Sequence, residues 1–501
     1  MAAALICGIS LAAASCSSND DNPATPDLGV KEKIIGKWMP VEADGQPLLT
    51  NEKWVTTFLS ATKATVSTSR SEHTSVAVRW HAYREYAVEI DGSKVILTSM
   101  VNDSVKLVEE FDISYISSTE MRCDYKHTTF VNGNAEMVDV ENNVRYVKQT
   151  ADYTAAILGL WECTGLMGIE TYNDANARLE FLTDGTYRYY RLADGGQWLA
   201  VTTREFQDYF VDGTLLATRW KNQGEDELRE WWEIESLSGN EMVWTALRQN
   251  ADGSTFQQKM TWKKIDLNIS EKIIGKWMQS ESDGEPMLTN KKTVTTFYSS
   301  THATVSTSRE TRYSTTVWSI NQEYDVKIEG NKVTLTYQQD ENTTLVNEYI
   351  VTDINDSEMI CTFRHLTIRN GEHRGRPMQI VHFTKQTTDY RTDIVGTWQG
   401  HCTSEGSVFD DGQEHRWEYK ADGTNVYYVK SGDNWVPYEG NTLNEYFVDG
   451  TLLCTRWIDL GQENREWWEI TIDGSQMHWT ALRQNPDGTT FTATFEMEKV
   501  E

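Results

Sequence analysis

Long internal repeats are the feature that most restricts what this chain of 501 residues can fold into. The segment IIGKWM at 34–39 recurs at 273–278, and TVSTSR at 65–70 recurs at 304–309 with the same spacing. A different pair, YFVDGTLLATRW at 209–220 and YFVDGTLLCTRW at 446–457, is followed both times by REWWEI and TALRQN. The chain is therefore a duplication, and each half has two distinct parts.

A shorter repeat divides the halves into units. A Gly-x-Trp step preceded by two aliphatic residues occurs four times, at Gly36/Trp38, Gly159/Trp161, Gly275/Trp277 and Gly396/Trp398. The sequence thus predicts four units in the order A-B-A-B, which we call A1 (31–150), B1 (151–266), A2 (267–387) and B2 (388–501).

The local pattern within each unit is that of short β-strands. Residues 85–99 alternate between apolar and polar around an Asp-Gly turn, their copy at 323–337 does the same, and 179–192 form another such hairpin. No long segment keeps a helical period of apolar residues. A unit of about 115 residues suits eight short strands closed into a barrel, so we expect an all-β protein of four tandem small antiparallel β-barrels.

The Gly-x-Trp step followed by hairpins, together with FLTDGTY at 181–187, resembles the lipocalin-like domains of surface lipoproteins from Bacteroidetes. The resemblance covers nearly the whole chain after its first 30 residues. It implies four calycin-type barrels that can contain an internal cavity. The family has no common reaction, and many members have no known ligand.

The N-terminal residues predict an export signal and an anchor. Residues 1–15 contain one apolar run, too short to span a bilayer, that fits a signal peptide. The sequence AASC ending at Cys16 resembles a bacterial lipobox, which implies that Cys16 carries lipid and that 16–30 form an acidic tether. The resemblance places the protein in the outer membrane facing the exterior, with the lipid as its membrane partner; an ordinary secretory signal is the alternative.

Charge and motifs exclude several functions. The formal net charge of −29 would repel nucleic-acid phosphates, so we expect no nucleic-acid partner. No phosphate-binding loop or nucleophile elbow is present, and Glu230 and Glu233 lie on opposite faces of their predicted strand. We therefore expect no enzyme, no cofactor and no metal site.

Adjacent tryptophans in the B units are the most informative candidates. Because neighbouring strand residues point to opposite faces, one indole of Trp231 and Trp232 faces inward and the other outward. If Trp232 faces inward with Ile234, then Trp231 lies outside between Arg229 and Glu233, which suits stacking on a sugar. Packing against a neighbouring unit is the alternative use of this face.

The same alternation predicts an inward set of tryptophans that forms either a filled core or a cavity wall. Arginines at 219 and 456 are candidates for its polar partners. The full set of candidate ligand-binding residues comprises Arg219, Trp220, Arg229, Trp231, Trp232, Glu233 and Trp244 in B1, and Arg456, Trp457, Arg465, Trp467, Trp468, Glu469 and Trp479 in B2.

Three functions remain open. The leading hypothesis is a surface protein without catalytic activity whose B units recognise a glycan such as a polysaccharide. The second is a carrier that holds a small apolar ligand inside its barrels. The third is a structural spacer or adhesin whose barrel cores are filled.

Overall fold

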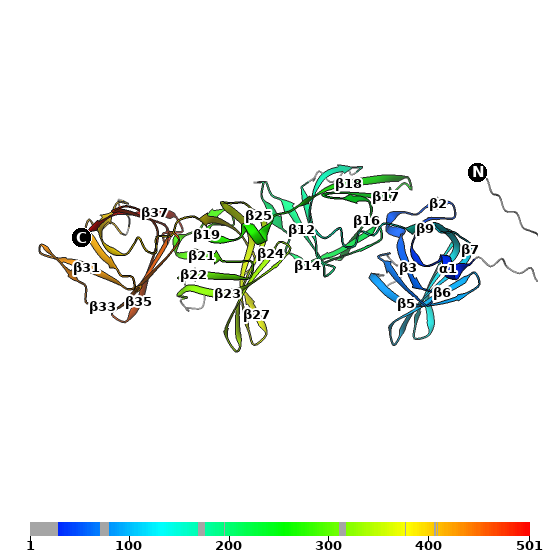
Figure 1. Ribbon diagram of the computed structural model, residues 1–501, viewed down its shortest axis with the longest axis horizontal. Helices are drawn as coiled ribbons and strands as arrows, with labels where there is room; N and C mark the ends of the chain where they lie inside the picture. Colours follow the sequence, from blue (N-terminus) through cyan, green and yellow to red (C-terminus); the bar gives the residue numbers. More distant parts are fainter. Residues whose placement is uncertain are drawn as a thin grey trace, which may run out of the picture. The chain divides into compact units, whose positions relative to one another are not determined.

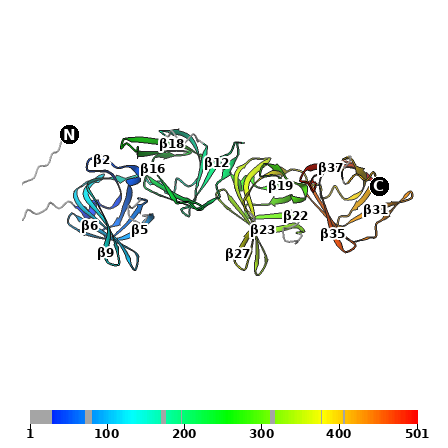
Figure 2. The same ribbon diagram turned by 180° about the vertical axis from the view of Figure 1, so that it is seen from behind.

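The computed structural model describes residues 29–70, 80–168, 176–194, 196–309, 317–375, 377–404, 407 and 409–500. The predicted signal peptide, Cys16 and most of the tether lie outside these residues. The chain divides into two compact units, Met1–Asp152 and Tyr153–Glu501. The first contains the A1 sheet, and the second contains the B1, A2 and B2 sheets (Figures 1 and 2).

The predicted fold class is confirmed, because the described residues form four separate antiparallel sheets, one for each repeat. Two of them, A1 and A2, close into eight-stranded barrels by pairing β1 with β9 and β19 with β28, while β2, β20 and β27 pair outside the closed ring. Their strands are β1 (Gly36–Ala43), β2 (Gln46–Pro47), β3 (Trp54–Ser60), β4 (Lys63–Thr68), β5 (His81–Asp91), β6 (Lys94–Asn102), β7 (Val105–Ile116), β8 (Glu120–Val131) and β9 (Asn134–Gln149) in A1, and β19 (Gly275–Ser282), β20 (Glu285–Pro286), β21 (Thr293–Phe297), β22 (His302–Thr307), β23 (Ser319–Glu329), β24 (Lys332–Asp340), β25 (Thr343–Ile354), β26 (Glu358–Arg369), β27 (Glu372–Gly375) and β28 (Gln379–Gln386) in A2.

The B1 and B2 sheets curl in the same way but form half-barrels with an open seam. The two edge strands of the B1 sheet are β13 and β14, and those of the B2 sheet are β32 and β33. Their strands are β10 (Gly159–Met167), β11 (Ala177–Phe181), β12 (Tyr187–Leu192), β13 (Trp198–Ala200), β14 (Arg204–Asp212), β15 (Leu215–Asn222), β16 (Glu227–Ser238), β17 (Glu241–Gln249) and β18 (Thr255–Ile265) in B1, and β29 (Gly396–Cys402), β30 (His415–Tyr419), β31 (Asn425–Ser431), β32 (Asn434–Pro437), β33 (Asn441–Asp449), β34 (Leu452–Asp459), β35 (Gln462–Asp473), β36 (Gln476–Gln484) and β37 (Thr490–Val500) in B2.

The Gly-x-Trp steps anchor the first strand of every sheet. In each unit the indole is fully buried, and its Nε1 donates to the carbonyl oxygen of the isoleucine four residues earlier, at 2.6–2.7 Å. A lysine from the last strand places its ammonium 5.1–5.2 Å from the centre of the same ring. Glycine is required before the tryptophan because its φ lies between 112° and 136° and a Cβ atom would press against that lysine. Only short helical turns accompany the strands in the described residues: α1 (Val30–Lys33), α2 (Ile269–Lys272), η1 (Thr50–Glu52) and η2 (Thr289–Lys291).

Within the second unit, neighbouring sheets make specific contacts. Leu160 and Tyr190 of B1 pack with Ile350 of A2. The Lys292 ammonium of A2 pairs with Glu469 of B2 at 2.7 Å. These contacts bury parts of the outward faces of the B1 and B2 sheets against A2.

Candidate functional site

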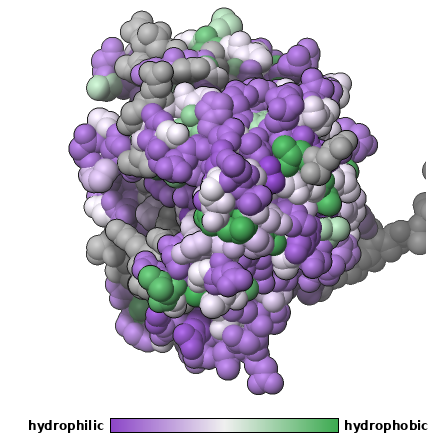
Figure 3. All heavy atoms as spheres, turned by 90° about the vertical axis from the view of Figure 1, so that its left-hand side faces the viewer, coloured by the Kyte–Doolittle hydropathy of each residue, from purple (hydrophilic) through white to green (hydrophobic). Residues whose placement is uncertain are grey.

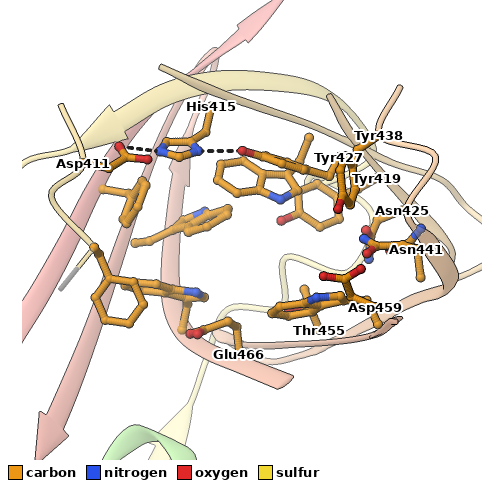
Figure 4. A pocket seen from close by; sticks show the side chains of 17 residues that line it. Asp411, His415, Tyr419, Asn425, Tyr427, Tyr438, Asn441, Thr455, Asp459 and Glu466 are labelled. Atoms are coloured by element: carbon orange, nitrogen blue, oxygen red, sulfur yellow. Dashed lines mark hydrogen bonds and ion pairs between the residues drawn. The ribbon is translucent and has the colours of Figure 1, made fainter. Parts of the chain in front are cut away.

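A cavity of about 370 Å³ lies inside the B2 half-barrel, and we call it the B2 pocket (Figure 4). Its volume falls within the range of roughly 300–1,000 Å³ typical of small-molecule sites. The pocket is lined by Phe409, Asp411, His415, Trp417, Tyr419, Asn425, Tyr427, Tyr438, Asn441, Asn444, Thr455, Trp457, Asp459, Glu466, Trp468, Trp479 and Phe495. The lining residues come from both edges of the seam and from the opposite wall.

The pocket is open because the two edge regions of the B2 sheet meet at one end only. There, Thr424 forms an isolated bridge with Glu445, and the Tyr446 N–H donates to the Gly423 carbonyl oxygen at 2.8 Å. The Tyr446 hydroxyl also donates to the carbonyl oxygen of Lys420 at 2.7 Å. In the described part of B2 no further strand pairing joins β31 or β32 to β33, so the rest of the seam is not closed by a ladder.

One wall of the pocket is a cluster of aromatic rings. The Trp479 ring centre lies 5.0 Å from that of Trp417, 5.4 Å from that of Trp468 and 5.6 Å from that of Phe495. The rings of all three pairs are tilted relative to each other, and these contacts hold the rings in place. The alternation of the strands explains the cluster, since Trp468 and Trp479 are the inward residues of β35 and β36.

Polar groups face this aromatic wall. Figure 4 shows the His415 imidazole between Asp411 and Tyr427, with distances of 3.2 Å to the carboxylate oxygen and 3.0 Å to the hydroxyl oxygen. Glu466 accepts a hydrogen bond from Arg483 at 2.6 Å. Asp459 lies on the same side of the pocket as Asn425 and Asn441, and its carboxylate makes no hydrogen bond or ion pair with any described residue.

Burial controls the ionisation of several lining groups. It raises the pKa of the Glu466 carboxyl, although the facing Arg483 guanidinium acts in the opposite direction. Burial also holds the pKa of the Tyr419 and Tyr427 hydroxyls above the ordinary value, so both phenols stay neutral. These hydroxyls are therefore available as hydrogen-bond groups and not as bases.

The structure brings three predicted residues, Trp457, Trp468 and Trp479, together at the B2 pocket. Their B1 counterparts lie differently. Trp232 and Trp244 are buried in the B1 core, with ring centres 5.8 Å apart, and Trp220 lies beneath the guanidinium of Arg204. In B2 these tryptophans thus line a cavity, and in B1 Trp232 and Trp244 belong to a packed hydrophobic cluster.

The leading hypothesis required an exposed tryptophan on the outward face of β35, but in B2 this tryptophan packs against A2. The Trp467 indole packs into a cluster with Met278 and Val294 of A2, and its Nε1 donates to the Ser308 carbonyl oxygen at 2.5 Å. Arg465 donates to the carbonyl oxygen of Val317 at 2.8 Å. Four linked units need interfaces, and the aromatic and charged face of β35 supplies one, so Trp467 is not free to stack on a sugar.

The remaining predicted residues are engaged in local pairs. Arg456 pairs with Glu445 and lies 4.6 Å from the Trp318 ring centre, and Glu469 is held by Lys292. In B1, Arg219 pairs with Asp208 at 2.7 Å and Arg229 with Glu227 at 2.6 Å. Trp231 and Glu233 are half-buried.

The sequence analysis missed most polar residues of the pocket. At matching strand positions, B2 has Asn441 where B1 has Arg204, Asp459 where B1 has Asn222, and His415 where B1 has Ala177. The signal was present as differences between two otherwise similar repeats. The identical segments contain only residues that the two units share, so they do not point to these positions.

The surface visible in Figure 3 is mainly hydrophilic, and its hydrophobic side chains gather only in small separate patches. Leu460 is the most exposed large apolar residue in the described chain, with 96 % of its surface accessible. Scattered exposed side chains of this kind are ordinary for a protein surface. None of the helices in the described residues is long and apolar enough to cross a membrane.

Comparisons with known proteins give weak structural likenesses. A double mutant of transferrin binding protein B from Haemophilus parasuis Hp5 matches with 8 % identity and a TM-score of 0.14, over 97 % of this chain and 98 % of the other. A putative outer membrane protein from Bacteroides fragilis NCTC 9343 matches with 11 % identity and a TM-score of 0.13, over 47 % of this chain and 99 % of the other. No protein-family model matches the chain. No curated protein matches its sequence.

Proposed function

We propose that this chain is a non-enzymatic surface lipoprotein that binds a small molecule inside the B2 half-barrel. The observation that carries the proposal is the B2 pocket itself, a cavity of about 370 Å³ with tryptophan walls and a few convergent polar groups. Sites that bind small molecules typically combine an apolar wall with a small number of polar groups.

Unpaired polar atoms favour a ligand with hydrogen-bonding groups over a purely apolar one. Trp479 Nε1, Tyr419 Oη, Asn441 Oδ1 and Asp459 Oδ1 are buried and have no hydrogen-bond partner among the described residues. The pocket lining also includes His415, Asn425 and the Asp459 carboxylate, which can hydrogen-bond to a polar ligand. A fatty acid chain offers these groups no hydrogen-bond partner.

Anchoring through Cys16 belongs to the same proposal. The lipobox-like sequence before Cys16 and the acidic residues after it support attachment to the outer membrane, with the barrels facing the exterior. Replacing Cys16 by Ser should move the chain from the membrane fraction to the soluble fraction. Unchanged membrane attachment of the Cys16→Ser chain would contradict the anchor.

Intrinsic tryptophan fluorescence of the full chain tests binding, because Trp417, Trp457, Trp468 and Trp479 line the pocket. We would titrate with three panels: neutral saccharides, fatty acids and small organic cations. We expect a saturable change with a polar panel, and its loss in Asn441→Arg, which places a long side chain in the pocket. Ser475→Arg is the matched control, since it adds the same charge to B2 at an exposed turn outside the residues that line the pocket. Absence of saturation with every panel, or equal binding by Asn441→Arg, would refute the proposal.

A further inference from the structure

The B1 half-barrel contains a cation of its own at the position that corresponds to the B2 pocket. The Arg204 guanidinium carbon lies 4.9 Å from the Tyr189 ring centre and 5.0 Å from that of Trp220. Its Nη1 donates to Gln207 Oε1 at 3.0 Å and to the Tyr187 hydroxyl at 3.4 Å. A guanidinium over two aromatic faces is a favourable cation–π arrangement, worth about 2 kcal/mol where water is excluded.

B2 keeps the aromatic surroundings of this cation and lacks the cation. Strand pairing places Tyr427 where B1 has Tyr189. Tyr189 lies opposite the central residue of β11, and Tyr427 lies opposite the central residue of β30. Trp457 takes the place of Trp220. Trp220 pairs with the third residue after the start of β14, and Trp457 pairs with the third residue after the start of β33. At the position of Arg204 itself stands Asn441, and Asn425 replaces Tyr187. These shorter side chains leave space between the two aromatic rings.

The charge of the pocket changes as well. Arg204 pairs across the strands with Asn222, whereas Asn441 pairs with Asp459. B2 thus gains a carboxylate where it loses the guanidinium. Glu466 is neutralised by Arg483 and Asp411 faces His415, but Asp459 has no cationic partner among the described residues. No lysine or arginine is present among the described residues that line the pocket.

We propose that the B2 pocket binds a small organic cation whose guanidinium or ammonium group occupies the place that Arg204 fills in B1. This inference rests on the proposed function and adds the chemical class of the ligand. The aromatic faces of Tyr427 and Trp457 attract the cation, and the Asp459 carboxylate accepts its N–H groups. The Asp459 carboxylate would repel an anion, and a neutral ligand would gain no charge–charge attraction from it.

Butylguanidinium and butylurea test the inference, because they have nearly the same shape and differ in charge. Titrated into the full chain and followed by tryptophan fluorescence, butylguanidinium should saturate the pocket at a concentration at least tenfold lower than butylurea. Equal affinity for the two compounds, or binding of butylurea alone, would overturn the inference.

Asp459→Asn examines the carboxylate directly. B1 has asparagine at the equivalent position, so the substitution suits the fold. We expect Asp459→Asn to weaken butylguanidinium binding at least fivefold and to leave butylurea binding unchanged. Asp473→Asn makes the same change at an exposed position of β35 and should alter neither. Unaltered butylguanidinium binding by Asp459→Asn would contradict the role of Asp459.

The outcomes separate this inference from the proposed function. Saccharide binding that Asn441→Arg abolishes, without any cation binding, would keep the pocket as a ligand site and refute the cation. Failure of every panel would refute both.

Discussion

The side chains at a few strand positions distinguish the interiors of the two B units, and the change from Arg204 to Asn441 is one of them. Arg204 is long enough to reach over Tyr189 and Trp220, so B1 supplies its own polar and charged filling. Asn441 ends short of the equivalent rings and bonds instead to Asn444 through its amide nitrogen, at 2.9 Å. Close packing is the rule in protein interiors, so shorter side chains at the positions of Arg204 and Tyr187 contribute to the space in B2.

Glu348 allows a test of residue-level electrostatics in A2. Burial raises the pKa of its carboxyl, but hydrogen bonds from Arg364 and Lys332 outweigh that effect, and the pKa is lowered overall. A carboxyl whose folded pKa is below its unfolded value adds stability above about pH 4.3, and that stability is lost as the pH falls through the folded pKa.

We therefore expect Glu348→Gln to destabilise the second unit by about 1–2 kcal/mol at pH 7, because charged hydrogen bonds are lost. The difference from the unaltered chain should shrink as the pH falls below 4. Thermal unfolding at a series of pH values measures both effects. Glu341→Gln, at an exposed turn of the same sheet, is the control and should change little. A destabilisation that is the same at every pH would show that the pairing does not depend on ionisation.

At the scale of elements, β35 serves two purposes through its alternating faces. Trp468 faces the pocket, while Trp467 faces A2 and bonds to the Ser308 carbonyl oxygen. Trp467→Ala should therefore lower the stability of the second unit by about 2 kcal/mol, the value expected for a large apolar side chain that leaves a packed contact. Thermal unfolding checks this.

Trp435→Ala provides the comparison for Trp467→Ala. Trp435 lies on the edge strand β32 and contacts Arg416 and Lys430 of its own sheet, so its loss should have a smaller effect. A Trp467→Ala chain of unchanged stability that loses saccharide binding would restore the outward face of β35 as a recognition surface.

Strand alternation made part of this arrangement predictable. The period of two residues placed Trp468 and Trp479 inward and Trp467 outward, and the repeats predicted four sheets in A-B-A-B order. Coverage of Trp467 by A2 could not be derived, because it depends on how residues far apart in the chain pack, as Trp467 and Met278 do. The open seam also depends on whether the edge strands β32 and β33 pair, which the pattern within each strand does not determine.

At the scale of the whole molecule, duplication gives two B units whose interiors differ in a few side chains. B1 retains Arg204 among its aromatic rings, and B2 has exchanged that internal group for space and an unpaired carboxylate. We therefore expect one binding site for butylguanidinium per chain, although the B unit occurs twice.

Converting B1 into a copy of the B2 pocket tests this view of the duplication. The triple substitution Tyr187→Asn, Arg204→Asn and Asn222→Asp gives B1 the three side chains that B2 has at matching positions. Calorimetric titration of the full chain should then show close to two butylguanidinium sites in place of one. In the same variant, Asn441→Arg should close the B2 site and return the number to one.

Because Tyr187 and Arg204 fill the B1 core, we expect the triple variant alone to unfold at a lower temperature and to regain stability when butylguanidinium binds. A folded triple variant that still binds one equivalent would show that Arg204 does not occupy a site equivalent to the B2 pocket.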